Sequence, residues 1–230
     1  MPTLSIVIPA YNEERFIGTL LHQVQAVPLE TLGVTSEIVV VDDCSTDRTS
    51  EIVRGIEGVR LFRLAGNSGK GAAVREGIAH ATGDYLIIQD ADLEYDPQDY
   101  LPMMRAILDR RADVVYGSRY LGTGRHAGQS LAAYLGGRSL SFVMLATTGR
   151  YLTDTVTALK LFPRTLLPSL ALETSGFETD HEITAKVLAR GLRIVEVPVT
   201  YKPRSKDEGK KIGLRDWFIG VRTLWHYRNG

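Results

Sequence analysis

The chain has 230 residues, of which 44% are hydrophobic and 23% are charged, and its 27 basic residues balance its 27 acidic ones. This length and composition are ordinary for a soluble globular protein with a real core, and the zero net charge argues against a nucleic-acid-binding protein, which is normally basic. The single cysteine, Cys44, excludes an internal disulfide. We see no signal peptide and no apolar run of membrane-spanning length, so we expect a cytoplasmic protein.

Strands and helices alternate along the first half. Apolar and β-branched runs predict strands at residues 4–9, 37–41, 59–64, 85–89 and 112–117. Between them we expect helices, the first capped by Asn12, the second by Ser45 or Thr46 and running through Arg54, the third beginning in the turn at 66–71 and the fourth at Asp96. This alternation predicts an α/β fold with a mainly parallel sheet.

The second half is less regular. We expect a loop, a helix, a strand, a short helix, a helix, an edge strand interrupted at Pro198, a basic loop and a last helix, at residues 118–129, 131–148, 158–162, 163–172, 178–190, 194–201, 202–211 and 214–227. Neither an internal repeat nor a low-complexity linker divides the chain. We therefore expect one domain, 1–230.

Polar clusters follow four of these elements, at residues 11–13, 42–43, 67–70 and 90–92. Parallel α/β sheets bind ligands at the carboxyl ends of their strands. Four clusters at one edge of a sheet predict a binding site more strongly than any one of them would.

The run Q-D-A-D-L-E at 89–94 directly follows a buried strand. Side chains alternate along a strand, so Asp90 and Asp92 are expected on one side, joined by Glu94 if the chain stays extended. A divalent cation would relieve the repulsion and desolvation of these carboxylates, and oxygen ligands favour Mg²⁺ or Mn²⁺ with positions left open for phosphates. We predict a metal–diphosphate site with Asp90, Asp92 and Glu94 as ligands. The alternative is solvated carboxylates or a helix cap.

Five motifs occur in order: V-I-P-A-Y-N-E at 7–13, V-V-D-D-C-S-T-D at 40–47, N-S-G-K-G at 67–71, D-A-D at 90–92 and G-S-R-Y at 117–120. With them the chain resembles the inverting family 2 glycosyltransferases of the GT-A fold, most of all the polyprenyl-phosphate (dolichyl-phosphate) mannose or glucose synthases. The resemblance implies a single GT-A catalytic domain, in which 1–117 binds the nucleotide sugar and 118–230 faces the acceptor. It implies transfer of a hexose from a GDP- or UDP-sugar to a polyprenyl phosphate, with Mg²⁺ or Mn²⁺ as cofactor and no nucleic acid as partner.

The same resemblance implies roles on the donor side. The nucleoside pocket would be lined by Pro9, Tyr11 and Glu13, with Asp42 or Asp43 on the base or ribose. Lys70 would lie near the diphosphate, although its glycine-flanked turn also fits a plain loop. Asp90 would border the sugar and the metal, and Asp92 would bind the metal directly. Glu94 stands where related synthases often carry Gln.

On the acceptor side, the resemblance assigns the acceptor phosphate to Arg119, Arg138 and Ser141. The planar fork of arginine suits phosphate, but each arginine could instead pair with a surface carboxylate. Transfer to a saccharide or small-molecule hydroxyl would require a general base, for which the candidates are Asp154, Glu178 and Asp180. A nucleotide-sugar-binding module without turnover is a further alternative.

Two features near the end of the chain have two interpretations each. The basic loop either closes over the diphosphate as a lid or is merely solvated; its cations are Lys202, Arg204, Lys206, Lys210 and Lys211. The last helix is either a peripheral contact with the inner face of the membrane or an amphipathic helix packed on the core; its apolar residues are Leu214, Trp217, Phe218, Val221 and Leu224.

Overall fold

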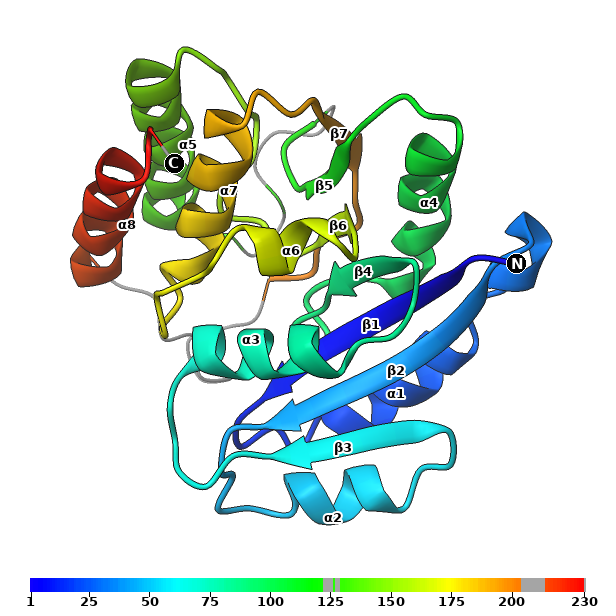
Figure 1. Cartoon of the computed structure of the whole chain (residues 1–230). Helices are drawn as coiled ribbons and strands as arrows, with labels where there is room; N and C mark the ends of the chain where they lie inside the picture. Colours follow the sequence, from blue (N-terminus) through cyan, green and yellow to red (C-terminus); the bar gives the residue numbers. More distant parts are fainter. Residues whose placement is uncertain (122–125, 127–128, 204–213, 230) are drawn as a thin grey trace.

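The computed structural model describes residues 1–121, 126, 129–203 and 214–229, and shows one seven-stranded sheet with helices on both faces (Figure 1). Strands β1 to β7 span Thr3–Ala10, Thr35–Asp42, Val59–Arg63, Tyr85–Ile88, Val114–Ser118, Lys160–Pro163 and Ile194–Pro198. Helices α1 to α8 span Ile17–Gln25, Thr49–Arg54, Lys70–His80, Tyr100–Leu108, Leu131–Thr148, Leu166–Ser169, Thr179–Ala189 and Leu214–His226. Short 3₁₀ helices lie at Leu29–Leu32 and Pro97–Asp99. The α/β class is confirmed.

The strand order is β3-β2-β1-β4-β6-β5-β7. All pairings are parallel except those of β6, which runs antiparallel between β4 and β5. β7 pairs only with β5 within this sheet, so the predicted edge position of that strand is confirmed. Because β6 is reversed, its first residue, Lys160, lies beside Ile88 at the carboxyl end of β4. The edge that collects the polar clusters thus also receives the start of β6.

Each face of the sheet has its own apolar core. One cluster packs α1, α2 and α4 on the sheet, with Leu20, Val53 and Met103 among its buried residues. The other packs α3, α6 and α7 on the opposite face, through residues such as Val74 and Ile183. A smaller cluster joins α5, α7 and α8 into a helical layer (Figure 1). Within the described residues, no helix is both long and apolar enough to cross a membrane.

Three predicted helix boundaries are wrong. Asn12 does not cap α1, since it has a φ of 56° and its Oδ1 accepts the N–H of Thr46 at 2.8 Å. Neither Ser45 nor Thr46 caps α2: its N-cap residue is Arg48, whose side chain makes no capping bond, and Asp47 accepts the N–H of Thr49 at 2.9 Å. The helix expected at 163–172 shortens to α6. For Asn12 and Ser45, side-chain bonds between the two loops replaced the local caps that the sequence suggested.

Candidate active site

Asp42 is the last residue of β2 and Asp43 follows it, and both side chains turn inward. Asp42 Oδ1 accepts the N–H of Ser45 at 2.9 Å, and its Oδ2 bonds the Ser50 hydroxyl and lies 3.4 Å from Arg63. The oxygens of Asp43 accept the N–H groups of Ser68 and Gly69, at 2.7 and 2.8 Å. Both carboxylates are buried. They therefore organise the loops, and contact with a base or ribose stays a prediction.

The first motif lies against the second. Pro9 is buried in β1, and the N–H of Glu13 donates to Thr49 Oγ1 at 2.9 Å. The N–H of Asn12 donates to Ser45 Oγ at 2.9 Å. Pro9, Tyr11 and Glu13 are thus brought to the same edge as Asp42 and Asp43. Their part in a nucleoside pocket stays a prediction.

The D-x-D element is a turn rather than the end of a strand. β4 stops at Ile88, Leu93 has a φ of 59°, and Asp92 Oδ1 accepts the N–H of Glu94 at 3.1 Å. The strand alternation used to align Asp90, Asp92 and Glu94 is therefore wrong as a geometric argument. Glu94 instead accepts the hydroxyl of Tyr201 at 3.1 Å.

The donor set still suits a hard cation. No group of three His, Cys, Asp or Glu side chains in the described ranges is arranged to hold a metal ion. Mg²⁺, however, is usually held by one or two carboxylates, with substrate phosphates and water completing its shell. Asp90 and Asp92 are two such carboxylates at the ligand-binding edge of the sheet. Their ligand roles, and that of Glu94, stay predictions.

Lys70 is the first residue of α3, and its Nζ lies 2.8 Å from Asp90 Oδ1 and 3.0 Å from Asp180 Oδ2. The other oxygen of Asp180 lies 2.8 Å from Lys160 Nζ. Burial alone would raise the pKa of Asp180, but the charges of Lys160 and Lys70 hold it well below its usual value. Burial lowers the pKa of Lys160, whereas for Lys70 the attraction of Asp180 and Asp90 outweighs burial and raises its pKa. Asp180 is consequently a poor general base.

Three amides at the turn before α3 are already bonded within the protein. The N–H groups of Ser68 and Gly69 go to Asp43, and the N–H of Gly71 donates to the carbonyl of Ser175 at 2.7 Å. A Cβ on Gly71 would lie 2.0 Å from Thr179 Oγ1, so this glycine permits close approach of α3 to α7. The side chain of Lys70 is a charged group at this turn that suits contact with a phosphate.

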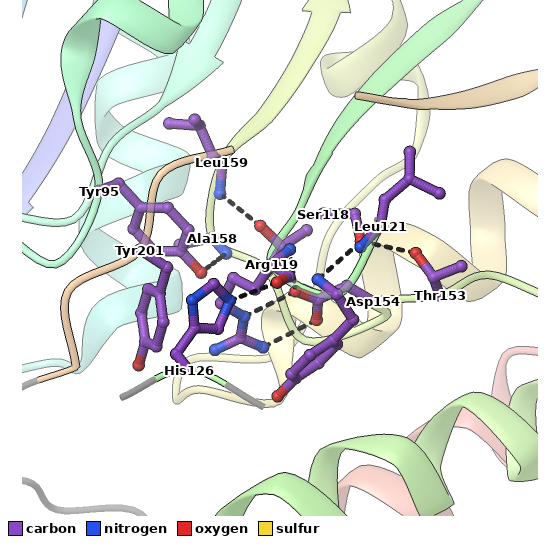
Figure 2. Close-up of polar contacts among 12 residues, drawn as sticks. Tyr95, Ser118, Arg119, Leu121, His126, Thr153, Asp154, Ala158, Leu159 and Tyr201 are labelled. Carbon is purple, nitrogen blue, oxygen red and sulfur yellow. Dashed lines mark hydrogen bonds and ion pairs between the residues drawn. The ribbon is translucent and has the colours of Figure 1, made fainter. Parts of the chain in front are cut away.

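Arg119 follows β5 and faces a buried carboxylate (Figure 2). Its Nε and Nη2 donate to Asp154 Oδ2 and Oδ1 at 2.6 and 2.8 Å, and its own N–H donates to Oδ2 at 3.1 Å. The Asp154 charge outweighs burial and raises the pKa of Arg119. Asp154 is fully buried, so the alternative of a surface partner is wrong for Arg119. Asp154 is the carboxylate that fixes this arginine, which makes it an unsuitable base.

Tyrosine rings surround the two arginines. The Arg119 guanidinium lies 5.1 Å from the ring centre of Tyr201 and 5.4 Å from that of Tyr120. Arg138, on α5, lies 5.7 Å from the same Tyr120 ring and donates to the carbonyl of Thr153 at 2.8 Å. Ser141, one turn further, donates to that carbonyl at 3.3 Å. Arg119, Arg138 and Ser141 are thus brought together, while their contact with an acceptor phosphate stays a prediction.

Some of the remaining candidate residues lie within the described part of the chain and others do not. Glu178 accepts the N–H of Gly176 at 3.2 Å beside the start of α7. Lys202 lies next to the D-x-D turn, since its N–H donates to the carbonyl of Glu94 at 2.8 Å. The other cations of the expected lid, Arg204, Lys206, Lys210 and Lys211, lie outside the described residues.

α8 packs largely inward, as its core-packed interpretation expected. Leu224 is fully buried, and Trp217 packs in the cluster shared with α5 while its Nε1 donates to Ser139 Oγ at 2.8 Å. Phe218 and Trp225 are exposed. A membrane contact through α8 stays a prediction.

Sequence reasoning missed Lys160 and Glu196. Glu196 accepts the N–H groups of Thr153 and Asp154 at 2.8 and 2.9 Å and so orients the loop behind Arg119. One signal was present: a lysine inside the apolar run A-L-K-L-F at 158–162 is out of place unless it has a buried partner. Glu196 gave no comparable signal.

The chain is similar in sequence to a known protein family and to two named relatives. Residues 5–160 match the sequence model described as Glycosyl transferase family 2. The low-salt glycan biosynthesis hexosyltransferase Agl6 of Haloferax volcanii is 30% identical over 207 residues, covering 90% of this chain and 49% of Agl6. The dolichol-phosphate mannosyltransferase of Pyrococcus furiosus is 29% identical over 217 residues, covering 91% of this chain and 59% of that protein. The chain thus spans only part of these two relatives.

Solved structures show the fold. Glucosyl-3-phosphoglycerate synthase from Mycobacterium tuberculosis, in complex with Mn²⁺, UDP and glucosyl-3-phosphoglycerate, has a TM-score of 0.73 at 22% identity, over 98% of this chain and 80% of that one. Mannosyl-3-phosphoglycerate synthase from Rubrobacter xylanophilus gives 0.71 at 18% identity, over 98% and 72%. The fold is the GT-A fold that the motifs predicted. The family model matches more than half of the length of this chain, and the chain therefore belongs to glycosyl transferase family 2.

Proposed function

We propose that this chain is the catalytic domain of an inverting, metal-dependent glycosyltransferase that moves a hexose from a nucleoside diphosphate to a polyprenyl phosphate. Membership of family 2 supports the reaction class. The names of the two relatives, a hexosyltransferase and a dolichol-phosphate mannosyltransferase, support the sugar class and the lipid acceptor. Mannose and glucose both remain candidates for the transferred sugar.

The donor would bind at the carboxyl edge of β1, β2 and β4. Mg²⁺ or Mn²⁺, held by Asp90 and Asp92, would neutralise the departing nucleoside diphosphate. The complex of Mn²⁺ and UDP in the mycobacterial synthase supports this donor class. Lys70, 2.8 Å from Asp90, would add a second positive charge beside the phosphates.

One observation carries the choice of a lipid acceptor: the exposed face of α5 is apolar around Arg138. Leu131, Leu135, Phe142 and Leu145 are between 40% and 59% exposed, and their spacing places them on one face with Arg138. The segment contains no acidic residue. Such a face suits an amphiphile with an anionic head at the arginines and a hydrocarbon chain along the helix.

The carboxylates also favour a phosphate nucleophile. A sugar hydroxyl would need a general base. Asp154 holds Arg119 with both oxygens, and Asp180 holds a lysine with each oxygen. A polyprenyl phosphate is already anionic near neutral pH, so it requires positioning and desolvation rather than deprotonation.

The test is a product assay with GDP- and UDP-hexoses, Mn²⁺ and three acceptors: a long-chain polyprenyl phosphate, a short-chain one and 3-phosphoglycerate. We expect a glycolipid product, with Arg138→Ala raising the acceptor KM by about tenfold or more and leaving the donor KM unchanged. Arg150→Ala, at an exposed position just after α5, is the matched control. A product with 3-phosphoglycerate alone would contradict the lipid acceptor, and a loss of donor binding in Arg138→Ala would contradict the role of Arg138.

The face of α5 can be tested separately. Phe142→Gln should raise the KM for the long-chain acceptor more than for the short-chain one, because only the long chain reaches beyond the arginines. Gln23→Ala, at an exposed position of α1, is the control. Flotation with anionic liposomes would test membrane contact: if the wild type does not float, the peripheral contact is wrong.

A further inference from the structure

Lys160 is a fully buried lysine at the first position of β6. Its Nζ lies 2.8 Å from Asp180 Oδ1 and 5.3 Å from the ring centre of Tyr116. Taking a lysine out of water is unfavourable, and a buried ion pair can often be replaced by apolar residues without loss of stability. Stability therefore gives no sufficient reason for a lysine at this position, and its electrostatic surroundings must be considered.

Lys160 lies at the buried end of a row of four side chains whose charges alternate in sign. Asp180 separates it from Lys70, and Lys70 separates Asp180 from Asp90, with successive contacts of 2.8, 3.0 and 2.8 Å. The four residues come from β6, the first turn of α7, the start of α3 and the turn after β4. Side-chain exposure rises along the row from 0% at Lys160 to 26% at Asp90. Ligands therefore meet Asp90 and Lys70, whereas Lys160 acts through the residues between.

The net charge of this row determines how strongly Lys70 can attract an anionic ligand. With Lys160 present, the row holds two positive and two negative charges. Without Lys160, the charge of Asp180 would be balanced by Lys70 alone. The three remaining residues would then carry a net negative charge. In this partly buried place, an additional negative charge a few ångströms from a diphosphate would be strongly unfavourable.

We propose that Lys160 is a positioning residue for the donor: by neutralising Asp180 it leaves the charge of Lys70 free to face the donor diphosphate beside Asp90. The inference rests on the proposed function, because it takes the ligand to be a nucleoside diphosphate. It gives Asp180 the role of a counter-ion shared by Lys70 and Lys160 rather than that of a base.

A cycle of variants separates this role from simple packing. Lys160→Met removes the charge and keeps the length of the side chain, Asp180→Asn removes its partner charge, and the double variant removes a neutral pair. Lys186→Met is the matched control, because Lys186 makes a buried 2.7 Å ion pair with Glu182 on α7 but does not contact the row. Calorimetric titration of each protein, with Mn²⁺, would measure Kd for UDP and GDP and for uridine and guanosine.

We expect Lys160→Met to weaken binding of the diphosphate by at least about tenfold, with binding of the nucleoside unchanged. The double variant should return to within about threefold of the wild type, because the row is again neutral. Lys186→Met should bind both ligands as the wild type does. A local packing defect would weaken nucleoside and diphosphate alike, and the second substitution would not repair it.

Three results would overturn the inference: diphosphate binding by Lys160→Met equal to that of the wild type, an equal loss for the nucleoside, or no recovery in the double variant. If Lys160→Met does not fold, Asp180→Asn decides, since the inference predicts diphosphate affinity equal to or above wild type and a structural role predicts a loss. A wild type that binds neither UDP nor GDP would overturn the proposed function, and the inference with it.

Discussion

Two buried carboxylates near the same edge of the sheet are used in opposite ways. Asp154 gives both oxygens to one guanidinium, in the two-pronged geometry that arginine favours. Asp180 gives one oxygen to each of two lysines on different elements. The first arrangement fixes its cation, and the second shares a cation that also reaches Asp90. A rigid cation suits a site that positions a nucleophile, and a shared one suits a site where charge must be redistributed when a ligand binds.

We expect the largest loss of stability when the carboxylate of Asp154 is removed. Asp154→Ala leaves Arg119 buried without its partner and should lower the free energy of unfolding by about 3–5 kcal/mol. Urea denaturation would measure it. The double variant Arg119→Leu/Asp154→Leu should lose less than the single one, because no charge is left unpaired. A single variant within about 1 kcal/mol of the wild type would show that Asp154 does not hold Arg119 in this way.

The surroundings of Asp180 can be examined through pH. The neighbouring His181 is buried, its Nδ1 has no hydrogen-bond partner among the described residues, and burial lowers its pKa to about 4. The unfolded chain, with a histidine pKa near 6.5, then binds more protons than the folded one between these values. The free energy of unfolding should therefore fall by up to about 3 kcal/mol as the pH is lowered from 6.5 to 4.

Denaturation at several pH values would follow this loss, which His181→Leu should reduce and the exposed control His22→Gln should not. The depressed pKa of Asp180 has the same sign but acts at lower pH. Its contribution is complete above the pKa of the unfolded chain, near 3.9, and is lost as the pH falls further. An unchanged slope in His181→Leu would assign the acid sensitivity to other groups.

Gly71→Ala tests the contact that keeps Lys70 near Asp180. Its Cβ would lie 2.0 Å from Thr179 Oγ1 and 2.6 Å from the carbonyl of Thr174, so α3 or α7 must shift. We expect a loss of about 1–3 kcal/mol in unfolding free energy, together with weaker UDP or GDP binding. Gly136→Ala, inside α5 with no atom within 4 Å of its Cβ, should instead stabilise by about 0.5–1 kcal/mol. Equal effects in the two variants would contradict the close-approach explanation.

The smallest effect is expected at an exposed ion pair, which gives a reference for the buried pairs of Asp154 and Asp180. Arg48 and Glu51 form a 3.1 Å pair on the surface, with side chains 70% and 67% exposed. Arg48→Ala should leave the midpoint of urea denaturation unchanged within experimental error, because water screens so exposed a pair. A larger change would mean that exposed pairs in this protein are stronger than usual, and the losses at Asp154 would need to be judged against that value.

Much of the first half could be predicted because its signals are local. The strands β1, β2 and β4 are apolar runs followed by polar clusters, and parallel strands necessarily deliver those clusters to one edge. The reversal of β6 could not be predicted, because a four-residue strand carries no sign of its direction. The turn that follows Asp90 could not be predicted for a related reason: the left-handed conformation of Leu93 depends on the fold around the turn.

The partners of the site residues could not be predicted either. Lys70 and Asp180 are 110 positions apart, and Arg119 and Asp154 are 35 apart. No periodicity links residues at such separations. Asp154 and Asp180 could be named as acidic candidates, but whether each acts as a base or as a counter-ion depends on which cation the fold places beside it.

The close approach of α3 to α7 has a consequence for how this sequence can diverge. A Cβ at position 71 would lie 2.6 Å from the backbone carbonyl of Thr174, and a Cβ at position 69 would lie 2.4 Å from that of Ser175. A smaller residue at 179 does not remove these backbone contacts, so descendants of this chain should keep glycine at 69 and 71 whatever residue stands at 179. An alignment in which 71 varies freely beside threonine at 179 would show that α3 and α7 can separate without loss.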